Sequence, residues 1–313
     1  MPAYTATAPG KIILFGEHAV VYNRPAIAVP VNQVQARAVV LADLKAPAGR
    51  VWIQAPDIQL DSSLDDLPEA NPMARLVRLF QEHVSLDHLP ACILRVSSTI
   101  PLAAGMGSGA AISVACLRAL SAFIGAPLPA EQVSALAYEI EKLYHGTPSG
   151  IDNTVVAFSK PVYFVRNSPI EILSLGEPIT LVIGDTGVRS PTSGPVEGVR
   201  RAWQADRAHF ETLFDRAAEI ARAARGWLES GEPDRLGSLM DENHALLVEM
   251  GASSPELDRL VQAARHAGAL GAKLSGGGWG GNMIALVDPA RTEQVSAALR
   301  ASEAVNTLIT RVL

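Results

Sequence analysis

The chain has 313 residues, of which 48% are apolar and 19% charged, so it is globular and long enough for two lobes. Its net charge of -6, with no long basic run, argues against a nucleic-acid-binding protein. There is no basic leader and no apolar stretch of membrane-spanning length, so we expect a cytoplasmic protein without a membrane partner. Cys92 and Cys116 lie far apart in apolar runs, which predicts core packing and suggests neither a disulfide framework nor a zinc site.

The first half of the chain is predicted to contain short strands and amphipathic helices. β-type runs separated by Gly, Pro, Asn and Asp predict strands, and apolar residues at helical spacing predict helices. The expected strands are 11–15, 26–31, 36–41, 51–54 and 91–98, and the expected helices are 71–83, 108–124 and 130–143.

The second half is predicted to be richer in helix. Strands are expected at 161–165, 179–185, 272–275, 283–287 and 306–312, and helices at 199–230, 236–250, 255–267 and from 289 onward. The break between lobes is expected within 169–195, which gives an N-terminal lobe of residues 1–180 and a C-terminal lobe of residues 181–313.

A glycine-rich loop lies between a predicted strand and the helix predicted from Ser108. Gly105, Gly107 and Gly109 stand at alternate positions, where glycine allows backbone N–H groups to converge on one point. The following helix adds the positive end of its dipole, so the segment can cradle a phosphate. A plain strand-to-helix turn explains an isolated loop of this kind equally well.

A second glycine cluster, 276–281, matches the spacing G-x-G-x-x-G. A dinucleotide-binding turn requires a helix directly afterwards, whereas 283–287 is predicted to be a strand. The sequence also lacks a Walker loop and the motifs that accompany the glycine loop of protein kinases. We therefore exclude these three nucleotide-binding classes.

Two further segments carry polar groups suited to catalysis. Glu141 near a helix end suits a divalent cation, and Asp152, in a tight loop rich in Gly and Pro, suits activation of an alcohol. Lys11 follows Pro-Gly at a predicted strand start, from which it can reach a phosphate or an acid. Taken singly, these residues and the pair Glu17–His18 are more often solvated surface groups.

The order of these motifs resembles the GHMP kinase superfamily and, within it, the mevalonate kinase family. The resemblance is carried by 10–21, by the glycine-rich loop, by 145–153, by 185–200 and by the late glycine loop. It implies an α/β fold of two lobes, one similar to ribosomal protein S5 and one ferredoxin-like, with the site between them. It also implies transfer of phosphate from ATP, with Mg²⁺, to mevalonate as the small-molecule partner.

The resemblance assigns a role to each matching residue. Asp152 and Lys11 are the expected catalytic residues, and Glu141 and Ser108 the expected metal ligands. The nucleotide phosphates are expected to lie against Ser98, Ala103, Ala104, Gly105, Met106, Gly107, Ser108 and Gly109. The substrate is expected to contact Glu17, His18, Tyr144, Thr192 and Gly277.

Two positions depart from the family pattern. Gly109 stands where the family usually has a serine that binds the metal, and Trp279 stands where mevalonate kinases usually have glycine. The alternatives are therefore another GHMP kinase acting on phosphomevalonate or a sugar, or a nucleotide-binding homologue without activity. A globular α/β protein of unrelated function is the remaining alternative. A homodimer is compatible with the sequence.

Overall fold

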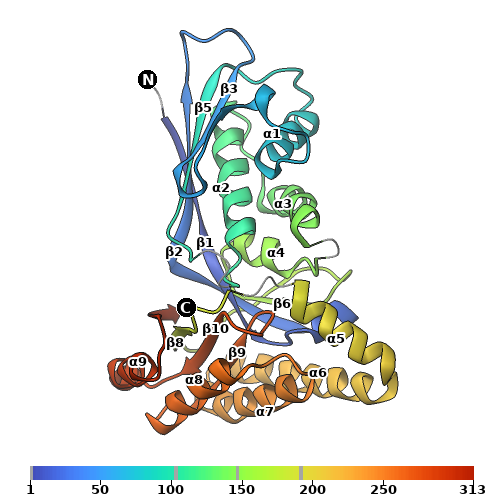
Figure 1. The fold of residues 1–313 in the computed structure, drawn as a ribbon, viewed down its shortest axis with the longest axis vertical. Helices are drawn as coiled ribbons and strands as arrows, with labels where there is room; N and C mark the ends of the chain where they lie inside the picture. Colours follow the sequence, from blue (N-terminus) through green and yellow to red (C-terminus); the bar gives the residue numbers. More distant parts are fainter. Residues whose placement is uncertain (1–2, 102–104, 146–147, 190–192) are drawn as a thin grey trace. The chain divides into compact units, whose positions relative to one another are not determined.

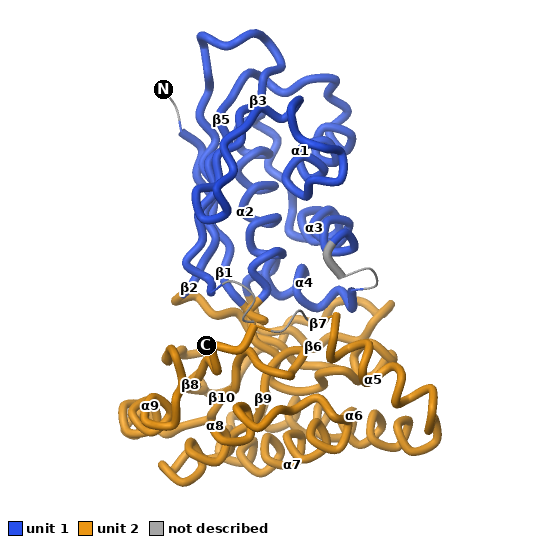
Figure 2. Tube along the Cα trace, in the orientation of Figure 1, with its two compact units in different colours: residues 1–10, 34–101, 107–159 blue, residues 11–33, 102–106, 160–313 orange. Residues whose placement is uncertain are grey.

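The structure, a computed structural model, describes residues 3–101, 105–145, 148–189 and 193–313. It divides into two compact units that alternate along the chain (Figure 2). Unit 1 comprises residues 1–10, 34–101 and 107–159, and unit 2 comprises 11–33, 102–106 and 160–313. Both units combine helices with a sheet, which confirms the predicted α/β fold (Figure 1). The predicted lobe boundary after residue 180 stays a prediction.

Unit 1 is a sheet with helices gathered on one side of it (Figure 1). The strands follow the order β4-β3-β5-β2, and β1 also pairs with β2. The β3–β5 pair is parallel, whereas β3–β4 and β2–β5 are antiparallel. These strands are β1 (Ala3–Phe15), β2 (Ala26–Ala42), β3 (Val51–Ala55), β4 (Leu60–Ser63) and β5 (Cys92–Ser98), of which β1 ends and β2 begins among the residues of unit 2. The helices are α1 (Pro72–His83), α2 (Ser108–Phe123), α3 (Ala130–His145) and α4 (Ile151–Phe158).

Local sequence explains these boundaries. Asn71 caps α1, since its side-chain oxygen accepts hydrogen bonds from the N–H groups of Met73 and Ala74. Pro72 occupies the first helical position, where a missing N–H costs nothing. Side chains along β3 alternate between buried and half-buried, as expected for a strand with one face on a core.

Unit 2 contains a second, antiparallel sheet in the order β11-β8-β10-β9. Its strands are β8 (Ile179–Asp185), β9 (Gly271–Ser275), β10 (Asn282–Leu286) and β11 (Asn306–Val312). Its helices are α5 (Ser193–Ala205), α6 (Arg207–Ser230), α7 (Leu236–Glu249), α8 (Pro255–His266) and α9 (Thr292–Ala301). Strands β6 (Val162–Phe164) and β7 (Glu171–Ile172) form a ladder with the first residues of β2.

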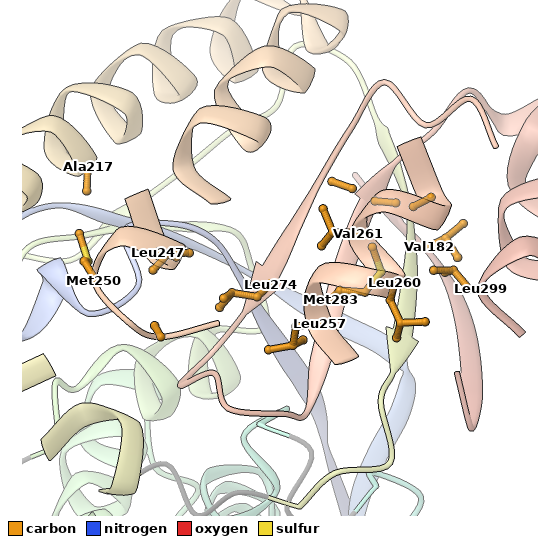
Figure 3. Close-up of a cluster of buried hydrophobic side chains, with 14 of the residues drawn as sticks. Val182, Ala217, Leu247, Met250, Leu257, Leu260, Val261, Leu274, Met283 and Leu299 are labelled. Carbon is orange, nitrogen blue, oxygen red and sulfur yellow. The ribbon is translucent and has the colours of Figure 1, made fainter. Parts of the chain in front are cut away.

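The core of unit 2 lies between this sheet and its helices. The strand–helix–strand–strand–helix–strand order of β8, α8, β9, β10, α9 and β11 is the ferredoxin-like arrangement expected for the C-terminal lobe. Fully buried apolar side chains from these elements form one cluster, which includes Val182, Leu257, Leu260, Leu274, Met283 and Leu299 (Figure 3). Helices α6 and α7 extend the cluster through residues such as Phe214 and Leu247.

Several predicted elements were wrong in extent. The strands predicted separately at 26–31 and 36–41 are one strand, β2. Pro30 does not interrupt it, because Pro30 lies between the part that pairs with β6 and the part that pairs with β5. The single helix 199–230 is two helices, since Asp206 leaves helical geometry and its carboxylate caps α6 by accepting from His209 N–H. The sequence prediction also missed β4, β7 and α4.

Cys92 and Cys116 are free and buried, as predicted. Burial raises the pKa of both thiols to about 12, so they stay protonated at neutral pH. Within the four described ranges, no helix has the length and apolar character needed to cross a membrane.

Candidate active site

In unit 1, the N-terminus of α2 presents backbone donors. Its N-cap is Gly107, whose φ of 70° lies in the left-handed region that favours glycine, and no described side chain caps the helix there. Ser108 and Gly109 form the first turn and are partly exposed. The first N–H groups of an α-helix have no intrahelical partner, so this turn can bind phosphate oxygens.

The rest of the predicted phosphate loop is divided between the units. Gly105 has a φ of 75°, and a Cβ there would meet no atom of the described residues within 4 Å. Ser98 ends β5, and its hydroxyl accepts a hydrogen bond from Ile100 N–H at 3.1 Å. Ala103 and Ala104 lie outside the described residues.

Glu141 and Asp152 are carried by two helices of unit 1 that pack together. On α4, the side-chain amide of Asn153 donates to the backbone oxygen and the hydroxyl of Ser134 on α3. The phenol of Tyr138, one turn further along α3, donates to Pro148 O at 3.3 Å. Ser134, Tyr138 and Glu141 share one face of α3, because residues spaced by four and three lie in line on a helix. Glu141 is 3% exposed, so this face brings a buried carboxylate toward the segment that bears Asp152.

The local structure of Asp152 differs from the prediction. It lies in the first turn of α4, whereas the sequence was interpreted as a tight loop. The loop ends before Asp152, because Gly150, with a φ of 95°, is the N-cap of α4. A carboxylate in the first turn of a helix is favoured by the helix dipole, and the helix holds it more rigidly than a loop would.

In unit 2, Lys11 lies inside β1 and not at its start as predicted, since pairing with β2 extends that strand back to Ala3. The side chain is buried, with 3% exposed, and its backbone N–H donates to Met106 O at 3.0 Å. This bond connects the strand of the predicted catalytic lysine to the middle of the predicted phosphate loop. The late glycine loop lies close by, because a Cβ on Gly276 would be 3.7 Å from Gly105 O.

Glu17 forms a fully buried ion pair with Lys273 on β9. The ammonium group also donates to Leu274 O at 2.7 Å. Burial raises the pKa of Glu17 and lowers that of Lys273, while the charge of each partner opposes the effect on the other. The second carboxylate oxygen, Oε2, is buried without a hydrogen-bond partner among the described residues. It is therefore an acceptor available to a bound molecule.

His18 is a buried, neutral imidazole with a defined tautomer. Its Nε2 lies 2.9 Å from Gly277 O, and a carbonyl can only accept, so Nε2 carries the proton. Burial lowers the pKa of His18 to about 4, against a weaker opposing effect of this hydrogen bond. The ring is therefore neutral at pH 7, and Nδ1 is an acceptor.

The sequence reasoning missed Lys273. A signal was present, since Lys273 is the only charged residue of the apolar segment Gly271–Ser275. A lysine inside a buried strand requires an acidic partner, and Glu17 could have been proposed as that partner. Thr192 lies outside the described residues, as does the side chain of Tyr144.

The late glycine loop, 276–281, is followed by β10, so the exclusion of a dinucleotide-binding turn is confirmed. Among the described residues, no three His, Cys, Asp or Glu side chains gather closely enough to hold a metal ion. Mg²⁺ usually takes one or two carboxylates together with phosphate oxygens and waters. Glu141, a buried carboxylate, has the donor chemistry for a magnesium ion whose other ligands come from a nucleotide and water.

Comparison with known proteins gives consistent matches over the whole chain. Residues 71–160 match the GHMP kinases N terminal domain, and residues 215–304 match the GHMP kinases C terminal domain. Mevalonate kinase of Aeropyrum pernix is 36% identical over 93% of this chain and 91% of its own length. Mevalonate kinase of Thermococcus sibiricus is 35% identical over 94% of this chain and 92% of its own length. The crystal structure of L. major mevalonate kinase in complex with R-mevalonate is 29% identical, with a TM-score of 0.83 over 100% of this chain and 96% of that one.

Proposed function

The chain belongs to the GHMP kinase family, and we propose that it is the member that transfers the γ-phosphoryl group of ATP to (R)-mevalonate, giving ADP and 5-phosphomevalonate. The observation that carries this proposal is the similarity to curated mevalonate kinases, which extends over more than nine-tenths of both chains. A kinase of this type needs positioned groups and charge neutralisation more than covalent chemistry, and the site residues offer both.

The nucleotide phosphates would bind at the N-terminus of α2. The N–H groups of its first turn would donate to phosphate oxygens, since no described side chain occupies them as a cap. Glu141 would hold Mg²⁺, which when bound neutralises charge on the β- and γ-phosphates. Gly109 offers no hydroxyl to the ion, and Ser108 or a water would take that place.

Phosphoryl transfer would depend on Asp152 and Lys11. The hydroxyl oxygen of the substrate attacks the γ-phosphorus as the bond to the ADP oxygen breaks. Asp152 would orient that hydroxyl and accept its proton, and the ammonium group of Lys11 would offset negative charge on the transferring group. A carboxylate is a weak base toward an alcohol, so orientation and electrostatics supply much of the rate enhancement.

The hydrogen-bond polarity of His18 and Glu17 points to a hydroxyl of the substrate. Nδ1 of neutral His18 is an acceptor, and so is Oε2 of Glu17. An acceptor binds a group that carries a proton and repels a carboxylate. Mevalonate carries two hydroxyl groups besides its carboxylate, so we infer that these two residues bind a hydroxyl, and that other groups bind the carboxylate.

The test is a coupled ADP-release assay with mevalonate, phosphomevalonate, galactose and homoserine. We expect turnover with mevalonate at a kcat/KM at least about 10²-fold above each competitor, because a site built for polar groups rejects analogues that leave those groups unpaired. Turnover dominated by another substrate would identify a different GHMP kinase. ATP binding without ADP release for any of the four would identify a homologue without activity.

A further inference from the structure

Trp279 is the large aromatic residue of the late glycine loop. Its φ is 56°, in the left-handed region where a bulky residue is uncommon, and its side chain is 39% exposed. Such a conformation persists only where surrounding contacts enforce it. Those contacts all lie within unit 2.

Two hydrogen bonds fix Trp279 to the turn after α7. Its backbone N–H donates to Ala252 O at 2.9 Å, and its indole Nε1–H donates to Gly251 O at 2.8 Å. The loop also presses against this turn at Gly278, where a Cβ would be 1.9 Å from Ala252 O. The indole ring of Trp279 therefore has little freedom to move away from the helix that it contacts, α5.

The indole ring covers two glycines that lie one turn apart on α5. A Cβ at Gly198 would be 2.8 Å from Cζ2 of Trp279, a distance shorter than any ordinary contact. A Cβ at Gly194 would be 3.4 Å from Cζ3, which is close to van der Waals contact. The indole ring can therefore approach α5 this closely only because Gly198 has no side chain.

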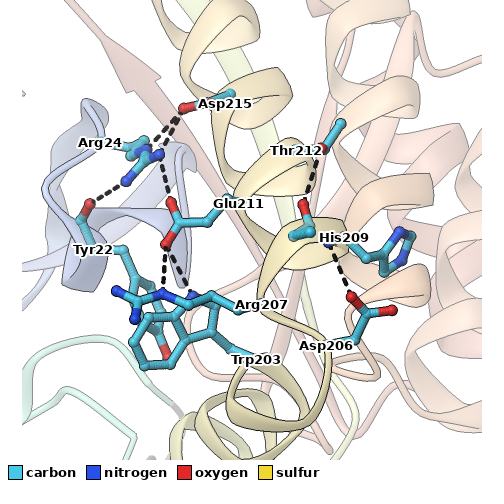
Figure 4. Close-up of polar contacts among 10 residues, drawn as sticks. Tyr22, Arg24, Trp203, Asp206, Arg207, His209, Glu211, Thr212 and Asp215 are labelled. Carbon is cyan, nitrogen blue, oxygen red and sulfur yellow. Dashed lines mark hydrogen bonds and ion pairs between the residues drawn. The ribbon is translucent and has the colours of Figure 1, made fainter.

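The other end of α5 is tied to the segment that follows His18. Trp203 of α5 packs against Tyr22, with ring centroids 5.1 Å apart (Figure 4). Tyr22 also stacks on Phe214 of α6. Tyr22 ends the short helix Ala19–Tyr22, which begins directly after His18. Helix α5 thus contacts the late glycine loop through Trp279 and the segment after His18 through Trp203. The His18–Gly277 hydrogen bond links these same two segments.

We propose that Trp279 is a positioning residue for the acid substrate. By holding the late glycine loop against α5, it fixes Gly277 O, which in turn fixes the ring of His18 and the direction of its acceptor Nδ1. The substrate named here rests on the proposed function, whereas the chain of contacts does not.

Three variants and one double variant test the proposal in the coupled assay, with thermal unfolding measured for each. Trp279→Ala should raise KM for mevalonate about tenfold and change KM for ATP less than about twofold, because the loss of a hydrogen bond and its packing acts on the substrate side alone. Gly198→Ala should raise KM for mevalonate similarly through the clash with the ring. Gly194→Ala is the matched control, with the same substitution under the same ring but without the clash, and should leave KM unchanged.

The helix propensities sharpen the test. Both Gly→Ala changes favour the helical state of α5, so a rise in KM for Gly198→Ala alone cannot come from a less stable helix. In Trp279→Ala/Gly198→Ala, the clash is absent, so KM should equal that of Trp279→Ala. Additive effects, or a Trp279→Ala variant that loses thermal stability with KM for mevalonate unchanged, would overturn the inference. A wild-type chain inactive on mevalonate would instead refute the proposed function.

Discussion

Replacing Lys273 by Met tests how strongly the buried ion pair supports the fold. The variant keeps most of the apolar stem of the side chain but removes the charge that faces Glu17. Both side chains are fully buried, and Oε2 of Glu17 has no described partner, so the carboxylate would lose its ion-pair partner in a buried site. Removing one partner of such a pair costs about 3–5 kcal/mol, a large part of the roughly 5–15 kcal/mol that stabilises a typical protein.

The pH dependence of this loss gives a second signature. Without Lys273, burial is opposed only by a backbone hydrogen bond and the charge of Lys11, so the pKa of Glu17 rises further above the ordinary value. The folded variant then binds more protons than the unfolded chain above pH 4.5, so its free energy of unfolding falls as the pH rises. We expect the difference between wild type and Lys273→Met, measured by urea unfolding, to be larger at pH 8 than at pH 5.

Two further variants make the result interpretable. Lys160→Met, which removes an exposed lysine from the same unit, should change the free energy of unfolding by less than about 0.5 kcal/mol. Lys273→Met/Glu17→Met should recover most of the stability, since apolar residues of similar volume often replace a buried pair without loss. A Lys273→Met variant as stable as wild type at both pH values would refute the reasoning.

Four other predictions concern the candidate site and two buried histidines, His18 and His244 of α7. Asp152→Asn should keep ATP affinity and lower kcat by about 10²-fold or more, as measured by nucleotide titration and turnover. Glu141→Gln should greatly raise the Mg²⁺ concentration needed for half-maximal turnover, whereas Gly109→Ser should leave that concentration unchanged or lower it slightly. An unchanged Mg²⁺ titration for Glu141→Gln would show that Glu141 is not a ligand of the ion. His18→Ala should raise KM for mevalonate by up to about tenfold with little change in KM for ATP, since a hydrogen bond to a hydroxyl of the substrate is lost. Burial lowers the pKa of His18 and His244 from 6.5 to about 4, so the unfolded chain binds more protons in that range. Stability should therefore be present above pH 6.5 and fall as the pH drops toward 4, by roughly 3 kcal/mol for each histidine; flat urea midpoints across this range would contradict it.

Local signals in the sequence predicted most elements well. The helix of α1 followed from the apolar spacing of Met73, Leu76, Val77 and Phe80, and the cap at Asn71 fixed its start. The wrong extents arose where a weak local signal competed with tertiary pairing. Pro30 is an ordinary strand breaker, but it falls where β2 changes partners, and no pattern along the chain shows that change.

The candidate site was predictable in its residue types and not in its connections. The glycine spacing identified a turn at Gly105 and Gly107, both of which have positive φ. The partner of Glu17 is 256 residues away along the chain, and the acceptor of His18 is 259 residues away. Periodicity and spacing cannot reveal such pairings, because they are set by how the strands of unit 2 assemble.

The alternation of the two units along the chain has a consequence for synthesis on the ribosome. The chain passes from one unit to the other at residues 10–11, 33–34, 101–102, 106–107 and 159–160. Ile13, in the early segment of unit 2, exchanges two hydrogen bonds with Ser275, which is made 262 residues later. At about 5–20 residues per second, that segment waits roughly 13–50 s for its partner strand. During this interval the apolar residues 12–15 are exposed and can aggregate with other chains. A holdase chaperone that binds the nascent N-terminal segment should therefore raise the yield of folded protein.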